Sequence, residues 1–225
     1  MSPGARPSPG DEGRPGDEGR TRRRPLVATL IPLLALAALL GWVAWNGART
    51  DSGSSRGPAA GSQMPPFAAP LAASGLEGDV NVARAGGEGA AGSRPACEVR
   101  GPDILNSCDL VDAGPAAVAF ITADDGRCAD ELDRLEAAAR ESGVGVAGVV
   151  VRGDRESARE LVAGRRWRSP VAWDRDGVLA NLYGVAVCPQ VVYVRQGGKV
   201  DGASVGTTSP AAIRAALERL QGEGP

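Results

Sequence analysis

The sequence contains no histidine, and this absence excludes more chemistry than any other feature of its composition. Without histidine the chain cannot form a Ser-His-Asp or Cys-His triad, an H-E-x-x-H zinc site or a C-x-x-C-H haem attachment. Cysteine is also scarce, at 4 residues, and none of them form a C-x2-C pair. We therefore expect neither a metal nor a cofactor, and the cysteines must be thiols or disulfides.

An excess of charge of one sign is missing as well. The chain carries 25 basic and 27 acidic residues, a formal net charge of -2, which gives no electrostatic reason to expect nucleic acid as a partner. Glycine (32) and proline (17) are, in contrast, too frequent for a chain that is globular throughout. Part of the chain must therefore be linker, and the sequence does not indicate an oligomeric state.

The N-terminal part of the chain predicts a tail followed by a membrane span. Residues 1–24 contain the repeat PGDEGRPGDEGR, which has nothing apolar to bury, so we expect a disordered tail. The run from Leu26 to Trp45 is 20 residues without a charge, or about 30 Å of helix, which is enough to cross a bilayer. Trp42 and Trp45 would form an aromatic belt at the far interface. We predict one transmembrane helix over 25–46.

The flanking charges predict the orientation of this span. The arginines of RTRRR precede it, so the positive-inside rule puts residues 1–24 in the cytoplasm and the rest of the chain outside the cell membrane. A cleaved signal peptide is the alternative. Its apolar region is usually only about 7 to 15 residues, with a small-x-small cleavage site after it, and this chain has a longer run and a bulky continuation. We expect an uncleaved anchor, and an oxidising environment for the residues beyond the span.

Residues 47–95 predict a flexible linker. They are mostly Gly, Ala, Ser and Pro with scattered charges, a composition that cannot bury enough surface to offset its ordering entropy. The working domain is then expected over 96–222, a usual size for one domain.

The first half of this domain has the pattern of a βαβ unit. The apolar runs 116–122 and 144–152 are typical of strands that are buried on both faces. Between them a helix is expected from Gly126, capped by Asp125. Its apolar residues fall at helical spacing and form one stripe: Cys128, Leu132, Leu135 and Ala139.

The second half continues the alternation of strands and helices. A helix is expected over 154–167 with Asp154 as its N-cap, then a short strand in SPVAWD and a short helix in GVLANLYG. Strands at 191–195 and 199–205 form a hairpin, and a last helix begins at Ser209 and Pro210. The fold class is α/β: a three-layer sandwich with a βαβαβ core, then a β-hairpin and a C-terminal helix, preceded by the transmembrane helix.

Three motifs in this order resemble the thioredoxin superfamily, and within it the membrane-anchored extracytoplasmic redoxins of the TlpA type. FITADDGRC resembles the strand and active-site turn F-x-A-x-W-C-x-x-C. SPVAWDRDGVLANLYGV resembles F-P-V-x-x-D-x-D-G-x-x-A-x-x-Y-G-V. VCPQVVYVRQGGKV resembles the strand that opens with the cis-proline, which implies that Pro189 is that proline. The resemblance spans roughly 97–220.

The first motif departs from the family at its most informative position. Asp125 matches the nucleophilic first cysteine, and Cys128 matches the second, resolving cysteine. A carboxylate cannot attack a disulfide, so ordinary C-x-x-C exchange is excluded. Asp125 also has a structural explanation, because an aspartate at the N-cap stabilises a helix by about 1 kcal/mol.

The resemblance supplies a replacement for the missing cysteine. Cys188 precedes Pro189, and the residue before the cis-proline borders the active-site cysteines in the family. The fold could therefore form a Cys128–Cys188 bridge, if their Cα atoms lie about 4.4 to 6.8 Å apart. The helix dipole and Arg127 would favour a Cys128 thiolate, whereas Asp124, Asp125 and burial on the apolar stripe would oppose it.

Cys97 and Cys108 form the other natural pair, close together ahead of the first buried strand. We expect a structural disulfide that contributes roughly 3 kcal/mol for a loop this short. Four cysteines permit three connectivities, so the other pairings stay open.

The sequence is compatible with three functions. The first is a membrane-tethered extracytoplasmic thiol-disulfide oxidoreductase that uses Cys128, Cys188 and Pro189 and acts on protein thiols or disulfides. The second is a redox-inactive thioredoxin-fold scaffold that binds a surface protein and has only structural disulfides. The third and weakest is a peroxiredoxin-like thiol peroxidase, whose T-x-x-C motif would require threonine at the position of Asp125.

Overall fold

The computed structural model describes residues 26–49, 57–76 and 94–222, without the side chains of 26–30 and 44–49. The expected disordered tail, 1–24, lies outside the described residues, and so does 77–93 of the expected linker. The chain divides into two units at Asp51/Ser52, a helix and an α/β domain, and each is described by itself.

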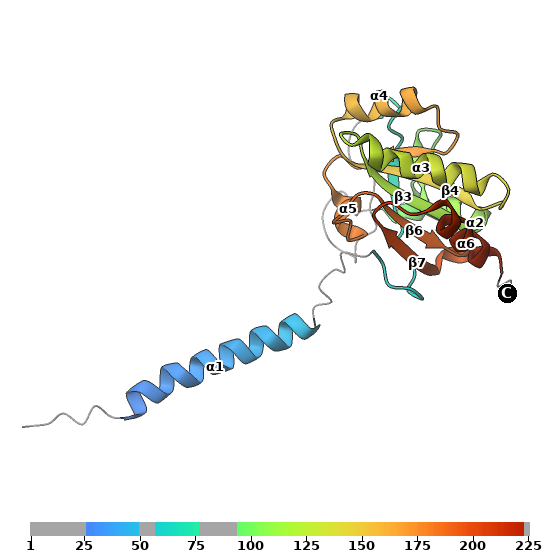
Figure 1. Ribbon diagram of the computed structural model, residues 1–225. Coiled ribbons are helices and arrows are strands. Elements are labelled where there is room, and N and C mark those ends of the chain that lie inside the picture. The colour runs from blue at the N-terminus through green and yellow to red at the C-terminus, as the bar shows by residue number, and fades with distance from the viewer. Residues whose placement is uncertain (1–25, 50–56, 77–93, 223–225) are drawn as a thin grey trace, which may run out of the picture. The chain divides into compact units, whose positions relative to one another are not determined.

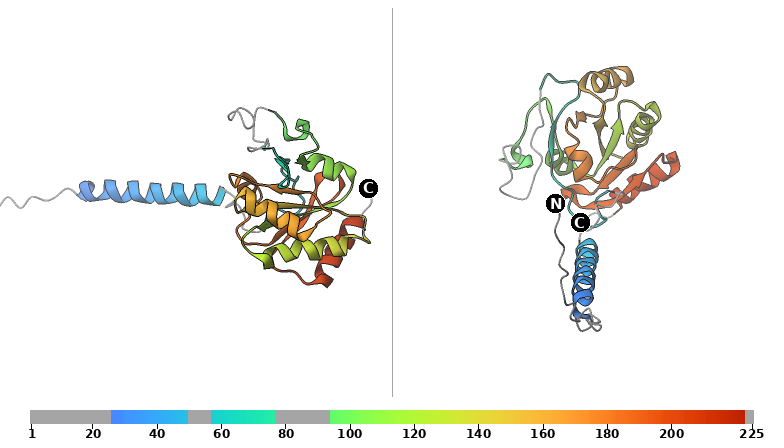
Figure 2. Two further views of the ribbon diagram at one scale, coloured as in Figure 1. Left: turned by 90° about the horizontal axis from the view of Figure 1, so that it is seen from above. Right: turned by 90° about the vertical axis from the view of Figure 1, so that its left-hand side faces the viewer.

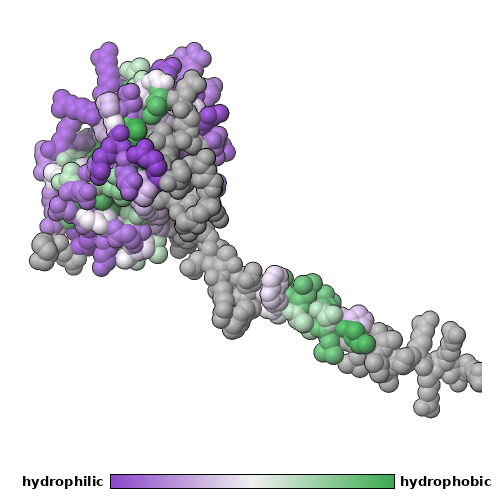
Figure 3. Space-filling view, turned by 180° about the vertical axis from the view of Figure 1, so that it is seen from behind, coloured by the Kyte–Doolittle hydropathy of each residue, from purple (hydrophilic) through white to green (hydrophobic). Residues whose placement is uncertain are grey.

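The first unit contains one helix, α1 (Leu26–Arg49), of 24 residues. It lies where the sequence predicts a helix, and its described central part is apolar on the surface in Figure 3. Over the described residues, no helix meets the combined requirements of length and apolar character for crossing a membrane. The predicted span over 25–46 remains a prediction.

The second unit is built on a five-stranded sheet in the order β5-β4-β3-β6-β7. Strands β3, β4 and β5 are parallel, whereas β6 and β7 run antiparallel to their neighbours. β3 is central, and its first six residues are buried, as expected for a strand that is covered on both faces. The strands are β3 (Ala116–Thr122), β4 (Gly145–Arg152), β5 (Val171–Trp173), β6 (Gln190–Val194) and β7 (Val200–Val205).

Helices cover both faces of this sheet and make a three-layer sandwich (Figures 1 and 2). On one face α3 (Gly126–Ala139) packs against α6 (Pro210–Gln221), and α4 (Arg155–Arg165) adds to the same core. On the other face, a second core contains residues of α2 (Ser107–Ala113) and α5 (Val178–Leu182). The predicted sandwich with a βαβαβ core is confirmed.

The local signals in the sequence act as predicted. Asp154 caps α4 by accepting the N–H of Ser157, and Ser209 caps α6 by accepting the N–H of Ala212. The turn at η3 (Gln196–Gly198) joins β6 to β7, so the predicted hairpin is confirmed.

The expected linker over 47–95 is wrong for residues 57–76, which form an N-terminal strap that belongs to the domain. At one edge of the sheet, the strap exchanges hydrogen bonds with Val200 of β7, from Gly61 N–H and to Ser62 O. At the other edge, the N–H of Ala72 donates to Val171 O of β5, at 2.8 Å. In between, β1 (Ala68–Pro70) pairs with β2 (Ile104–Asn106) in a separate small sheet.

Apolar anchors explain why this Pro- and Ala-rich segment is ordered. Phe67 is fully buried, with its ring edge-on to that of Tyr183 at a centroid distance of 5.8 Å. The Tyr183 hydroxyl donates to the carbonyl of Pro65 at 2.6 Å. Two large buried apolar side chains, Met64 and Phe67, therefore help to fix a segment whose average composition is that of a linker.

Replacing Phe67 tests whether the strap is part of the folded domain. Phe67→Ala should lower the free energy of unfolding by about 3 to 5 kcal/mol, because it leaves a cavity against Tyr183. Leu76→Ala is the control, since Leu76 is 36% exposed and should cost less than about 1 kcal/mol. Urea unfolding of the whole chain, monitored by near-ultraviolet circular dichroism, measures both. Equal stability of the two variants would show that the strap does not contribute to the fold.

Candidate active site

A disulfide joins Cys128 to Cys188 across 60 residues of sequence. Cys128 lies in the first turn of α3, and Cys188 lies directly before β6, at a cis peptide bond to Pro189. The two Cα atoms are 5.6 Å apart, within the range that a disulfide requires. The structure thus brings together the three residues that the resemblance singled out, Cys128, Cys188 and Pro189.

Asp125 fixes the start of α3. Its backbone is extended, and its carboxylate accepts the N–H of Arg127 at 3.0 Å, as an N-cap does. The predicted cap is confirmed. The residue that the resemblance aligns with the first cysteine of a C-x-x-C motif thus begins the helix that carries Cys128.

A salt bridge from α4 holds the N-terminal half of α3. The Arg165 guanidinium contacts the carboxylates of Asp130 and Asp133, and it donates to the carbonyl of Gly126 at 2.9 Å. The hydrogen bond to Asp130 raises the pKa of Arg165, so this contact keeps its charge at every physiological pH. α3 is therefore anchored at the end where its cysteine lies.

The two sulfur-bearing residues differ in exposure. Cys128 is 1% exposed and belongs to the core cluster with Leu132 and Leu135, whereas Cys188 is partly exposed at the edge of that cluster. Arg127, expected to favour a Cys128 thiolate, has a side chain that is 90% exposed and pairs with Asp125. Of the effects weighed from sequence, the burial of Cys128 is the one that the structure shows directly.

A cavity of about 230 Å³ lies beside Cys188. It is at the carboxyl ends of β3 and β4, where open α/β sheets commonly bind ligands. The Cys188 sulfur is 3.9 Å from the hydroxyl oxygen of Thr122. The lining residues are Thr122, Val151, Arg152, Ala180, Val185, Ala186, Val187 and Cys188.

Two buried carboxylates near the site were missed by sequence reasoning. Glu131 is fully buried, pairs with Arg134 and accepts the N–H of Thr208. Its position three residues after Cys128 puts it on the buried side of α3, a signal that helical spacing could have given. Asp174 accepts the N–H of Ala180, and burial raises the pKa of its carboxyl, against the lowering effect of the backbone N–H groups of α5.

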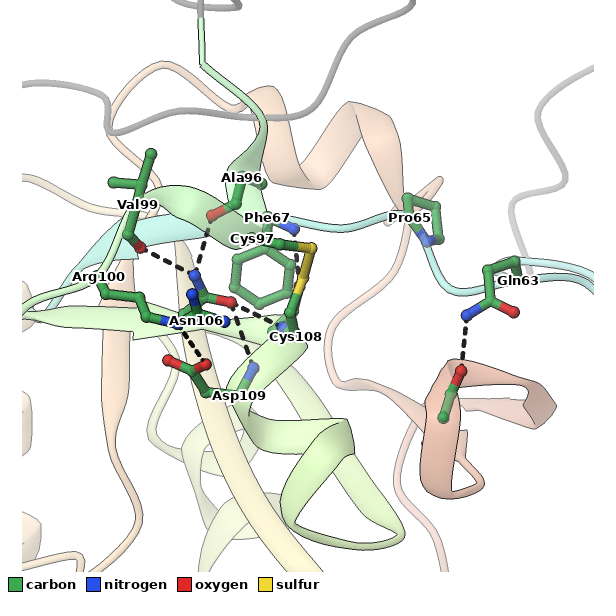
Figure 4. Close-up of a disulfide and its surroundings, with 12 residues drawn as sticks. Gln63, Pro65, Phe67, Ala96, Cys97, Val99, Arg100, Asn106, Cys108 and Asp109 are labelled. Carbon is green, nitrogen blue, oxygen red and sulfur yellow. Dashed lines mark hydrogen bonds and ion pairs between the residues drawn. A yellow bond between two sulfur atoms is a disulfide. The ribbon is translucent and has the colours of Figure 1, made fainter.

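The second disulfide joins Cys97 of η2 (Ala96–Glu98) to Cys108 of α2, with Cα atoms 5.4 Å apart (Figure 4). Asn106 lies beside it and holds both segments. Its amide donates to the carbonyls of Ala96 and Val99, and its oxygen accepts the N–H groups of Cys108 and Asp109. The predicted pairing is confirmed, in a place where hydrogen bonds already fix the two cysteines.

This second disulfide also adjoins the strap. The backbone N–H of Phe67 donates to the Ser107 hydroxyl at 2.7 Å, and Ser107 N–H donates back to the carbonyl of Phe67. The salt bridge of Arg100 with Asp109 adds a further link between the η2 segment and α2. Within the described ranges, no group of Cys, Asp and Glu side chains could hold a metal ion.

Comparison with known proteins gives the fold and no family. No family model matches the chain, and neither does any curated protein. A thiol:disulfide interchange protein of the thioredoxin family from Chlorobium tepidum has a TM-score of 0.52 at 14% identity, over 72% of this chain and 98% of that one. The peroxidoxin BcpB of Mycobacterium tuberculosis has a TM-score of 0.51 at 15% identity, over 74% and 98%. The domain has the thioredoxin-like fold.

Substituting Asp125 separates its role as a cap from a role in chemistry. Asp125→Ala should lower the free energy of unfolding by about 1 kcal/mol, because an N-cap acceptor is lost, and Asp125→Asn should retain most of that stability. Urea unfolding of the whole chain gives both values. If Asp125→Ala instead left stability unchanged and abolished disulfide exchange, the carboxylate would have a chemical role.

Proposed function

We propose that the protein is a membrane-tethered, extracytoplasmic thiol-disulfide oxidoreductase that uses Cys128 and Cys188 in place of a C-x-x-C pair. The observation that carries this proposal is the position of the bridge. It links the first turn of α3 to the residue before the cis-proline, and it borders a cavity at the carboxyl ends of the parallel strands. The Cys97–Cys108 bridge also borders a cavity, of about 240 Å³, so what distinguishes Cys128–Cys188 is its place before the cis-proline and at the carboxyl ends of the parallel strands.

The reaction is thiol-disulfide exchange with a protein partner. A thiolate of one molecule attacks a sulfur of the other's disulfide, and the mixed disulfide is resolved by a second thiol. The bridge supplies the disulfide in the oxidised protein, and the two thiols supply the nucleophiles after reduction. Pro189 is the residue beside which the partner's chain would bind. Neither step requires histidine, which the sequence lacks.

A thioredoxin-fold scaffold that only binds a partner is the second candidate, and the burial of Cys128 favours it. A cysteine that is 1% exposed among core residues is typical of a structural disulfide. Asp125 as a cap agrees with this candidate too, because it removes the reactive cysteine from the turn. The two candidates differ in whether the bridge can be opened while the domain stays folded.

The proposed tether rests on the arginine run before α1 and on the uncharged run within it. In this arrangement residues 1–24 are cytoplasmic, and the α/β domain acts outside the membrane. A disulfide enzyme would find protein thiols and disulfides there, in a compartment where two disulfides persist.

A redox titration distinguishes the enzyme from the scaffold. In the intact chain, the Cys128–Cys188 bridge should open above about -300 mV, while Cys97–Cys108 stays closed because Asn106 keeps its two cysteines together for reclosure. Disulfides are mapped by mass spectrometry at each potential, with circular dichroism as the check that the domain stays folded. Bridges that open together, and only as the domain unfolds, would favour the scaffold.

A membrane wash tests the tether. The whole chain should stay with the membrane pellet after alkaline carbonate extraction, because a 20-residue uncharged helix partitions into the bilayer. The matched variant replaces two residues in the middle of the run, Leu36→Arg and Leu39→Arg. It should appear in the supernatant. A full-length protein that carbonate releases completely would contradict the anchor.

A further inference from the structure

We infer that Cys188, and not the helical Cys128, is the sulfur that exchange partners attack, and that Arg152 selects partner cysteines with an acidic neighbour. The inference rests on the proposed function and specifies its direction of attack and its substrate class. It reverses the usual arrangement of a helix-borne nucleophile, because here the reactive sulfur lies on the loop before β6.

Access to the two sulfurs is unequal. An exchange partner must approach along the S–S axis and contact the sulfur that it attacks. Cys128 is 1% exposed among core residues of α3, whereas Cys188 is partly exposed and lines the cavity of about 230 Å³. Attack on Cys128 would require the core to open first, and attack on Cys188 does not.

The cavity next to Cys188 can receive a segment of a partner. Five of its eight lining residues are alanine or valine, namely Val151 of β4, Ala180 of α5 and the loop 185–187, and Val187 beside the cysteine is 50% exposed. These groups fit a small apolar side chain next to the partner's cysteine. The hydroxyl of Thr122, 3.9 Å from the Cys188 sulfur, can donate to the thiolate once the bridge has opened.

Arg152 gives the cavity its charge preference. It is the one charged residue among those that line the cavity, and its side chain is exposed. In the part of the chain that the structure describes, no carboxylate forms an ion pair with it. Asp124 is exposed nearby but does not line the cavity. A cation without a partner at a binding cavity attracts an acidic residue of the substrate.

The exchange balances with a partner dithiol as reductant. The partner's thiolate attacks the Cys188 sulfur, and a bond forms between these two sulfurs. The Cys128–Cys188 bond breaks, and Cys128 leaves with the electron pair and takes a proton. The partner's second thiol then loses its proton and attacks the partner's sulfur in the mixed disulfide, which releases Cys188 as a thiolate that takes up a proton. The partner is oxidised by two electrons to a disulfide, and its two protons are balanced by those taken up on Cys128 and Cys188.

Two single variants of the whole chain, in a mild non-ionic detergent, test the direction of attack. Cys128→Ser leaves Cys188 as a thiol and Cys188→Ser leaves Cys128, and both lack the bridge equally. With dithiodipyridine, a small neutral disulfide, Cys128→Ser should react at least about ten-fold faster, because a buried thiol must wait for local opening. An equal or faster reaction of Cys188→Ser would overturn the inference.

The charge preference is measured with two synthetic peptide thiols that differ only in glutamate or lysine beside the cysteine. Rates of reduction of the oxidised wild type are divided by each peptide's rate with dithiodipyridine, which removes its intrinsic reactivity. In the wild type at low salt, the corrected rate with the glutamate peptide should exceed that with the lysine peptide by about three-fold or more. This ratio of the two corrected rates should persist in Arg152→Lys and invert in Arg152→Glu. A ratio that is the same in all three proteins would overturn the role of Arg152.

These outcomes separate the inference from the proposed function. If the wild-type bridge resists both peptides and mild reductants while the domain is folded, the oxidoreductase proposal fails, whichever cysteine is more reactive in the variants. If the wild type exchanges readily but Cys188→Ser is the faster variant, the oxidoreductase stands and the inferred direction of attack is wrong.

Discussion

The burial of β3 on both faces is the constraint on which the rest of the domain depends. Six consecutive residues, 116–121, lie in the sheet interior without solvent contact, and they alternate between the two cores. A strand of this kind is stable only when helices cover both faces, which requires the crossover through α3. Because β3 ends at Thr122, the same constraint brings the start of α3, and so Cys128, to the end of the sheet at which β6 begins. The position of the disulfide is a consequence of this crossover.

The N-terminal strap solves a second problem, the two open edges of the sheet. β7 and β5 are the edge strands, and unpaired edges are sites of non-native pairing. The strap bonds to both through backbone groups of Gly61, Ser62 and Ala72, and its middle is fixed by Phe67. The Cys97–Cys108 bridge and Asn106 hold the segment against which β1 pairs. The second disulfide therefore helps to hold the strap, which covers the two edge strands of the sheet.

Short-range signals in the sequence predicted the sandwich but did not predict that the strap is ordered, and the reason is physical. The order from β3 to α6 is set by apolar periodicity and by caps such as Asp125, Asp154 and Ser209, which act within a few residues. The strap is ordered by contacts with residues distant in sequence, such as Ser107 at 40 positions from Phe67 and Tyr183 at 118 positions from Pro65, and local composition does not record these. The Cys128–Cys188 pair was predicted only through the resemblance, since a separation of 60 residues has no local signature. The burial of Cys128 follows from its place on the apolar stripe of α3, whereas the partial exposure of Cys188 required the folded structure.

Whether the Cys128–Cys188 bridge is structural or reactive is a difference of degree, because one free energy determines both properties. By thermodynamic linkage, the free energy by which the bridge stabilises the fold equals the free energy by which folding stabilises the bridge against reduction. Closing a loop of 60 residues stabilises the folded state by about 4 kcal/mol in the chain-entropy description. For a two-electron couple this equals about 90 mV of resistance to reduction, relative to the same pair in the unfolded chain. Potentials of known exchange proteins span more than this, from about -120 to -270 mV. A long loop therefore makes the bridge harder to reduce without excluding it from exchange. The access of a partner to the Cys188 sulfur then decides whether exchange occurs.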